Sequence, residues 1–63
     1  MMNRYYTLYR PPMPGTIPRG AKDVEAFDER QYCPEVDAWA WGWAEYDHQL
    51  SQEEVDEYEL EPL

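Results

Sequence analysis

The side chains that could do the most chemistry are carboxylates gathered near the C-terminus. Residues 45–63 hold eight acids and no Lys or Arg, and six of the acids fall within nine positions. On a helix that rises about 1.5 Å per residue, six charges in nine residues give one charge per roughly 2 Å of axis. Duplex DNA carries one charge per about 1.7 Å. The sequence therefore predicts an anionic partner-binding surface made by Glu53, Glu54, Asp56, Glu57, Glu59 and Glu61.

This acidic segment has an alternative interpretation as a solvated surface that keeps a small protein soluble. Solubilising surfaces usually intersperse both signs of charge. No Lys or Arg follows Arg30, so one sign is unopposed through the second half of the chain. That bias favours a surface that competes for a basic, phosphate-binding groove on another protein.

Catalytic and metal-binding patterns are weak in this chain. Cys33 and His48 are its one cysteine and one histidine, too few for a nucleophile–base–acid triad or for a structural zinc site. The acids do not follow a calcium-loop pattern, and no Gly-rich phosphate loop occurs. We therefore expect no catalytic residue, no metal and no cofactor, and a protein that is not an enzyme.

Three tryptophans alternate with small residues over Asp37–Asp47. Trp39, Trp41 and Trp43 would share one face of a strand, with alanines and Gly42 on the other. Exposed, the indoles could stack on bases or sugars or anchor a protein partner. We favour a core role, since they are the largest apolar mass in a chain with few Leu or Ile.

The elements that must position these residues can be read from the same pattern. Residues 3–10 and 37–46 are predicted as strands, and 24–32 is a candidate third strand that also fits a helical turn. PPMPGTIPRG is a loop. Ser51 and Glu54 form a capping box, and Leu50 and Val55 a hydrophobic staple, so a helix is expected over about 52–59. The predicted fold is an α+β single domain, 1–63, with a two- to three-stranded antiparallel sheet and a short C-terminal helix.

Length and charge limit the partner. Sixty-three residues leave room for one small domain. The formal charge is +4 over residues 1–22, −5 over 23–44 and −8 over 45–63. Direct nucleic-acid binding is not expected, because phosphate contacts require clustered Lys and Arg. Without an apolar run of roughly 20 residues or a signal-like segment, we expect a cytoplasmic protein with no membrane contact. The sequence does not specify an oligomeric state.

The blocks YYTLYRPPMPGTIPRG, WAWGWAEYD and LSQEEVDEYEL resemble small, uncharacterised acidic proteins carried by mobile genetic elements of gut Gram-positive bacteria. In size and charge the chain is also similar to anti-CRISPR and anti-restriction proteins as a class. That resemblance implies a non-enzymatic, DNA-mimic-like inhibitor that binds the basic groove of a host defence nuclease, an RNA-guided nuclease being one candidate. The alternative is an adaptor or homo-oligomer that uses the Trp face.

Overall fold

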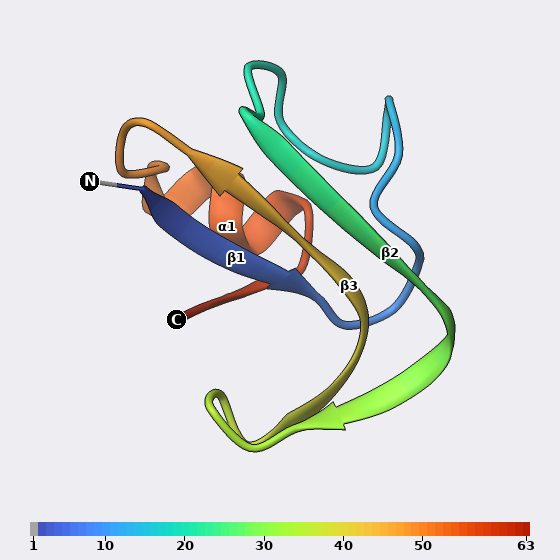
Figure 1. Ribbon diagram of the computed structural model, residues 1–63. Coiled ribbons are helices and arrows are strands. Elements are labelled where there is room, and N and C mark those ends of the chain that lie inside the picture. The colour runs from blue at the N-terminus through green and yellow to red at the C-terminus, as the bar shows by residue number, and fades with distance from the viewer. Residues whose placement is uncertain (1) are drawn as a thin grey trace.

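A computed structural model describes residues 2–63 as one antiparallel sheet with a short helix packed against it (Figure 1). The elements in chain order are β1 (Asn3–Thr7), β2 (Asp23–Cys33), β3 (Ala38–Tyr46), α1 (Gln52–Glu57) and β4 (Leu60–Pro62). The spatial order of the strands is β2-β3-β1-β4. The two central strands, β3 and β1, are therefore flanked by the longest strand and the shortest one.

The predicted fold class was wrong in its strand number. The sheet has four strands, because the chain leaves α1 at Glu57 and returns as β4 instead of continuing as helix to residue 59. Glu59 has a φ of 55°, a left-handed conformation that ends the helix, and Leu60 then pairs with Thr7. Such C-terminal reversals usually carry Gly, which has no Cβ to clash. Here Glu occupies the position, so no residue typical of a helix end marks the reversal.

Two predicted strands are present, and the ambiguous segment is a third. β1 is shorter than predicted and stops at Thr7, before the Pro-rich loop. β3 matches the predicted 37–46 within one residue. The ambiguous segment is strand throughout, as β2, and lies at one edge of the sheet.

The β2–β3 hairpin bends away from the rest of the sheet (Figure 1). Pairing between the two strands shifts register between Ala26 and Gln31, and a shift of this kind adds residues to one strand and bends it. Beyond the shift the hairpin closes through a tight turn in which the N–H of Val36 donates to the carbonyl of Cys33 at 3.2 Å. The bent half buries Cys33 and Ala40 in a small cluster with Tyr6.

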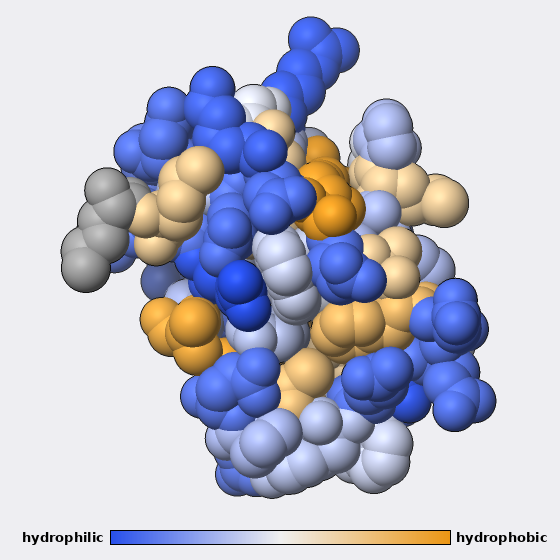
Figure 2. Space-filling view, in the orientation of Figure 1, coloured by the Kyte–Doolittle hydropathy of each residue, from blue (hydrophilic) through white to orange (hydrophobic). Residues whose placement is uncertain are grey.

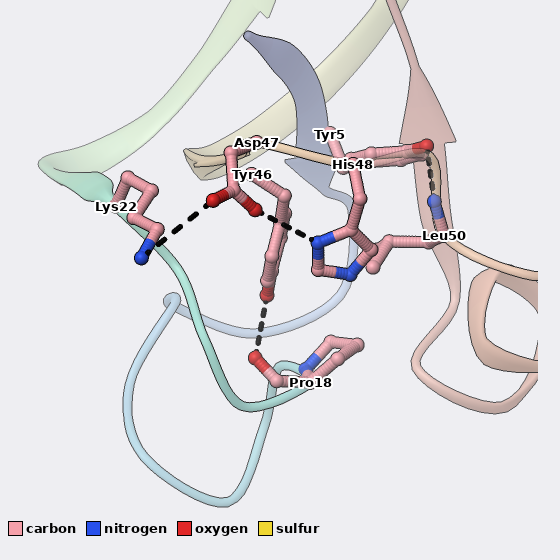
Figure 3. A network of polar contacts seen from close by, with 7 residues as sticks. All are labelled: Tyr5, Pro18, Lys22, Tyr46, Asp47, His48 and Leu50. Carbon is pink, nitrogen blue, oxygen red and sulfur yellow. Dashed lines mark hydrogen bonds and ion pairs between the residues drawn. The ribbon is translucent and has the colours of Figure 1, made fainter.

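The main core lies between the sheet and α1. It combines aromatic and aliphatic side chains from β1, β3, the loop after β1 and the C-terminal segment: Tyr5, Ile17, Ala44, Tyr46, Leu50, Val55 and Leu60. Two tyrosines also tie loops to this core (Figure 3). The Tyr46 hydroxyl donates to the Pro18 carbonyl at 2.6 Å, and the Leu50 N–H donates to the Tyr5 hydroxyl at 2.9 Å.

Gly42 marks the closest approach of three segments. A Cβ at this position would overlap the carbonyl oxygen of Glu25 and lie 2.8 Å from ring carbons of Pro12. The Pro-rich segment therefore crosses directly over β3, and a buried proline lies where a side chain would otherwise project. The expectation of a loop in this segment is confirmed.

The favoured core role of the tryptophans was wrong for Trp39, whereas Trp43 packs against the small cluster of Tyr6, Cys33 and Ala40. Strand alternation is observed, but the small residues point inward: Ala40 and Ala44 are 0% and 1% exposed, whereas Trp39 is 54% exposed. Trp41 and Trp43 are half-buried. The small face is buried because other segments pack against it: Tyr5 and Leu60 share a core cluster with Ala44, and Pro12 lies against Gly42.

Candidate functional site

Local sequence rules position the start of the acidic segment. Ser51 caps α1: its Oγ accepts the N–H of Glu54 at 3.1 Å, and the Glu54 carboxylate accepts the N–H of Ser51, also at 3.1 Å. Leu50 and Val55, on either side of this cap, are both buried in the main core. The predicted capping box and helix start are confirmed. Together with the buried Leu50 and Val55 they fix the first helical turn, which carries the first acids, against the sheet.

The six predicted acids do not lie on one helix. Four belong to α1, while Glu59 lies in the turn that follows it and Glu61 lies in β4, paired with Tyr6. α1 is six residues long, so the DNA-like spacing calculated for a continuous helix does not hold across the whole set. The carboxylates instead extend from α1 through the turn to the edge strand, a region we call the acidic edge and define as residues 53–61.

The members of the acidic edge differ in how they are engaged. Glu54 belongs to the capping box, and Asp56 accepts the Gln52 side-chain amide at 2.9 Å. Glu59 accepts Arg10 Nη2 at 2.6 Å in an exposed ion pair, which partly neutralises that end. Within residues 2–63, Glu53 and Glu57 are exposed and take part in no salt bridge or side-chain hydrogen bond. These two have carboxylates fully available to a partner.

A second candidate binding surface lies on the face of β3 that carries the tryptophans. The odd positions of residues 37–45 read Asp, Trp, Trp, Trp, Glu, so acids flank the three indoles. The guanidinium of Arg4 lies over the ring of Trp43, with 3.8 Å from Cζ to the ring centroid. The same Arg4 pairs with Glu45 at 2.8 Å. Sequence reasoning did not anticipate this contact, although Arg4 and Trp43 lie on the same face of neighbouring strands.

Burial and a shared hydrogen bond shift the pKa values of Tyr6 and Glu35 near that surface. The buried Tyr6 donates its hydroxyl to the Glu35 carboxylate, which joins the hairpin turn to β1. Burial, followed by this hydrogen bond, raises the pKa of Tyr6, and the same bond lowers the pKa of Glu35. The bond thereby favours the charged form of Glu35 in the hairpin turn.

Cys33 and His48 are not brought together. Cys33 is buried where the bent hairpin meets Tyr6, and burial raises the pKa of its thiol. His48 follows the opposite end of β3, stacks edge-on against Tyr46 and contacts Asp47 (Figure 3). The Asp47 carboxylate also faces Lys22 at 3.7 Å, and its pKa is lowered chiefly by the bond to His48.

Figure 2 shows hydrophilic residues over most of one face, with hydrophobic residues in separate patches. Across residues 2–63, no group of three or more His, Cys, Asp or Glu side chains is arranged to hold a metal ion. The described helix is too short to cross a membrane. An open groove of about 660 Å³ lies between the Pro-rich loop, Val24 and Tyr58. Its lining is mostly apolar, and the sequence did not predict it.

Comparison with known proteins gives one match. The defence against restriction A C-terminal family matches residues 1–63. No significant match was found among curated proteins or among solved structures. The family match supports the anti-restriction part of the expected resemblance and does not extend to anti-CRISPR proteins or to a gut Gram-positive source. The chain belongs to the defence against restriction A C-terminal family.

Proposed function

We propose that this protein protects DNA from restriction as a non-enzymatic inhibitor whose acidic edge binds the basic nucleic-acid-binding groove of a host defence nuclease. The observation that carries the proposal is the exposed, unpaired state of Glu53 and Glu57 in a chain whose family is described as defence against restriction. A basic groove that binds phosphates is the protein surface most complementary to such carboxylates.

Charge distribution supports this reading of the acidic edge. The chain has a net charge of −9, and its last basic residue is Arg30. Arg10 neutralises only one end of the acidic edge, through Glu59. The carboxylates of α1 are oriented by its capped first turn, so their positions on the surface are fixed by the fold rather than by a flexible tail. A preorganised charge array loses less entropy on binding than a disordered one.

The second candidate function is an adaptor or self-associating protein that binds through the Trp face. The 54% exposure of Trp39 favours it, because large exposed aromatics are common at protein–protein interfaces. On that reading the acids serve solubility, and neutralising them would leave binding unchanged.

The test is cleavage of duplex DNA by a panel of purified restriction nucleases, with increasing amounts of this protein. We expect the wild type to slow cleavage by at least one of these nucleases, and Glu53→Gln with Glu57→Gln to protect less. The matched control is Asp28→Asn with Glu29→Gln, which removes the same charge from exposed positions of β2, outside the acidic edge.

Equal loss of protection in both double variants would mean that only total charge matters, and the assignment of the site to the acidic edge would fail. Full protection by the Glu53/Glu57 variant would favour the adaptor reading. Circular dichroism of each variant should show an unchanged fold, since within residues 2–63 neither pair contributes to the core or to an ion pair.

A further inference from the structure

The Trp face of β3 has a regular chemical pattern that the proposed function does not use. We define the Trp row as Trp39, Trp41 and Trp43, which share one face of the strand, and it is flanked by Asp37 and Glu45. Trp43 also has Glu25 as its cross-strand partner in β2. Carboxylates therefore lie at both ends of the Trp row and beside Trp43.

One position in the row already holds a cation. The Arg4 guanidinium stacks on Trp43 while its nitrogens contact the Glu45 carboxylate at 2.8 Å and 2.9 Å. Guanidinium groups combine stacking on an aromatic face with paired hydrogen bonds to a carboxylate, which an ammonium cannot do. The chain thus contains a working example of arginine recognition on the same strand face.

The other two indoles have no such occupant within residues 2–63. Trp39 is 54% exposed and contacts Tyr32 edge-on, with ring centroids 5.8 Å apart. The Tyr32 hydroxyl donates to Asp37, which holds that carboxylate beside the aromatic pair. Trp41 is half-buried and lies opposite the register shift of β2. Aromatic surface and negative charge are both present here, and among the described residues no cation–π contact occupies either indole.

We propose that the Trp row binds arginine side chains of an extended basic segment of a partner protein, at Trp39 and Trp41, in the manner that Arg4 contacts Trp43. Charge complementarity selects this occupant: residues 23–46 hold seven acids and one Arg, a formal charge of −6. The electron-rich indole face attracts the same cations that these acids attract. The proposal rests on the proposed function only for the basic character of the partner.

The test uses the purified protein and two synthetic peptides of equal charge, nonaarginine and nonalysine, titrated while tryptophan fluorescence and indole N–H resonances are followed. We expect the arginine peptide to bind at least about threefold more tightly, because its planar groups stack. Because the probe is a peptide, the result does not depend on which nuclease, if any, the acidic edge inhibits.

Substitutions locate the contact. Trp39→Leu and Trp41→Leu should each weaken nonaarginine binding by about three- to tenfold, while Tyr9→Leu should leave it unchanged, since Tyr9 is a 63% exposed aromatic outside the row. Trp39→Leu alone decides the matter if the Trp41 variant fails to fold. The Glu53/Glu57 variant should retain the preference for arginine over lysine.

Four outcomes would overturn the proposal. The first is equal affinity for both peptides, and the second is unchanged nonaarginine binding in Trp39→Leu. The third is binding of a thymidine oligonucleotide to the row that Trp39→Leu abolishes. The fourth is self-association of the protein alone that the same variant abolishes. The third would indicate a base-stacking platform, and the fourth a second copy of this chain as the occupant.

Discussion

The two faces of β3 differ in side-chain size and in burial: the face with small side chains is the more buried one. One face carries Ala40, Gly42 and Ala44 and is almost fully covered; the other carries the Trp row and is partly open to solvent. In most small domains the largest apolar side chains close the core. Here β3 buries one large side chain, Tyr46 at its end, and its small residues let Pro12 and side chains of other segments pack closely against it.

This arrangement separates stability from recognition within a single strand. The small face accepts Pro12 directly against Gly42 and carries Ala44 and Tyr46 of the main core, while on the opposite face Trp39 is exposed and the other two indoles are half-buried. Substitutions on the small face should therefore affect folding, and substitutions in the Trp row should affect binding.

The largest effect is expected for Gly42→Ala. The added methyl group meets backbone of β2 as well as the Pro12 ring, so it cannot be absorbed by rotation of a flexible side chain. We expect the free energy of unfolding to fall by about 3 kcal/mol or more, at the upper end of overpacking effects. Urea denaturation followed by circular dichroism measures it. A stability within 0.5 kcal/mol of wild type would show that β3 and the Pro-rich loop are farther apart than described.

The next effect contrasts two tyrosine hydroxyls. Tyr46→Phe leaves the buried Pro18 carbonyl without its donor and should cost about 1–3 kcal/mol. Tyr32→Phe, in the exposed half of the hairpin, removes only an exposed contact to Asp37 and should change stability by less than about 0.5 kcal/mol. Thermal melts of the two variants measure both losses of stability. Equal losses would contradict the difference in burial between the two hydroxyls.

The buried hydroxyl of Tyr46 should make the stability of the protein depend on pH. Burial raises the pKa of Tyr46 to about 12, above its ordinary value of 10.0, so the folded protein retains this proton at a pH where the unfolded chain releases it. Stability should therefore fall as pH rises from about 10 to about 12. The slope of unfolding free energy against pH should be shallower in Tyr46→Phe, and an identical slope would mean that another group is responsible.

A smaller loss is expected at the cap of the helix that covers the core. Ser51→Ala removes the acceptor for the Glu54 N–H and should lower stability by about 0.5–2 kcal/mol. Differential scanning calorimetry would detect the shift. Ser51→Asp is the matched control, because its carboxylate can accept the same bond, and it should retain most of the wild-type stability. An unchanged midpoint in the alanine variant would contradict the capping role.

The smallest effect on folding should come from the Trp row. Trp39→Ala removes a side chain that is 54% exposed and should cost less than about 1 kcal/mol. A loss of 3 kcal/mol or more would restore the interpretation of the tryptophans as core. Chemical denaturation of Trp39→Ala and Gly42→Ala under the same conditions compares the two faces of β3.

Sequence rules were sufficient where structure is local. The capping box at Ser51 and Glu54, the alternation of β3 and the Pro-rich loop are all determined by near neighbours. The predictions failed where distant segments decide. Which face of β3 is buried depends on Tyr5 and Ile17, and the existence of β4 depends on pairing with Thr7 after an unsignalled reversal at Glu59.

The candidate site shows the same division. The sequence located the acids and assigned Glu54 to the cap, but it could not show that Arg10, 49 residues away, pairs with Glu59. It also could not separate the exposed Glu53 and Glu57 from the rest. Those distinctions depend on tertiary contacts, and they reduce six candidate carboxylates to two fully available ones.

The most direct measurement is competition between this protein and a labelled duplex for one restriction nuclease that it inhibits. If the acidic edge occupies the nucleic-acid-binding groove, the protein should displace the duplex, displacement should weaken steeply as salt rises, and Glu53→Gln with Glu57→Gln should weaken it more than Asp28→Asn with Glu29→Gln. Formation of a stable complex that contains nuclease, duplex and this protein together would contradict binding in the groove.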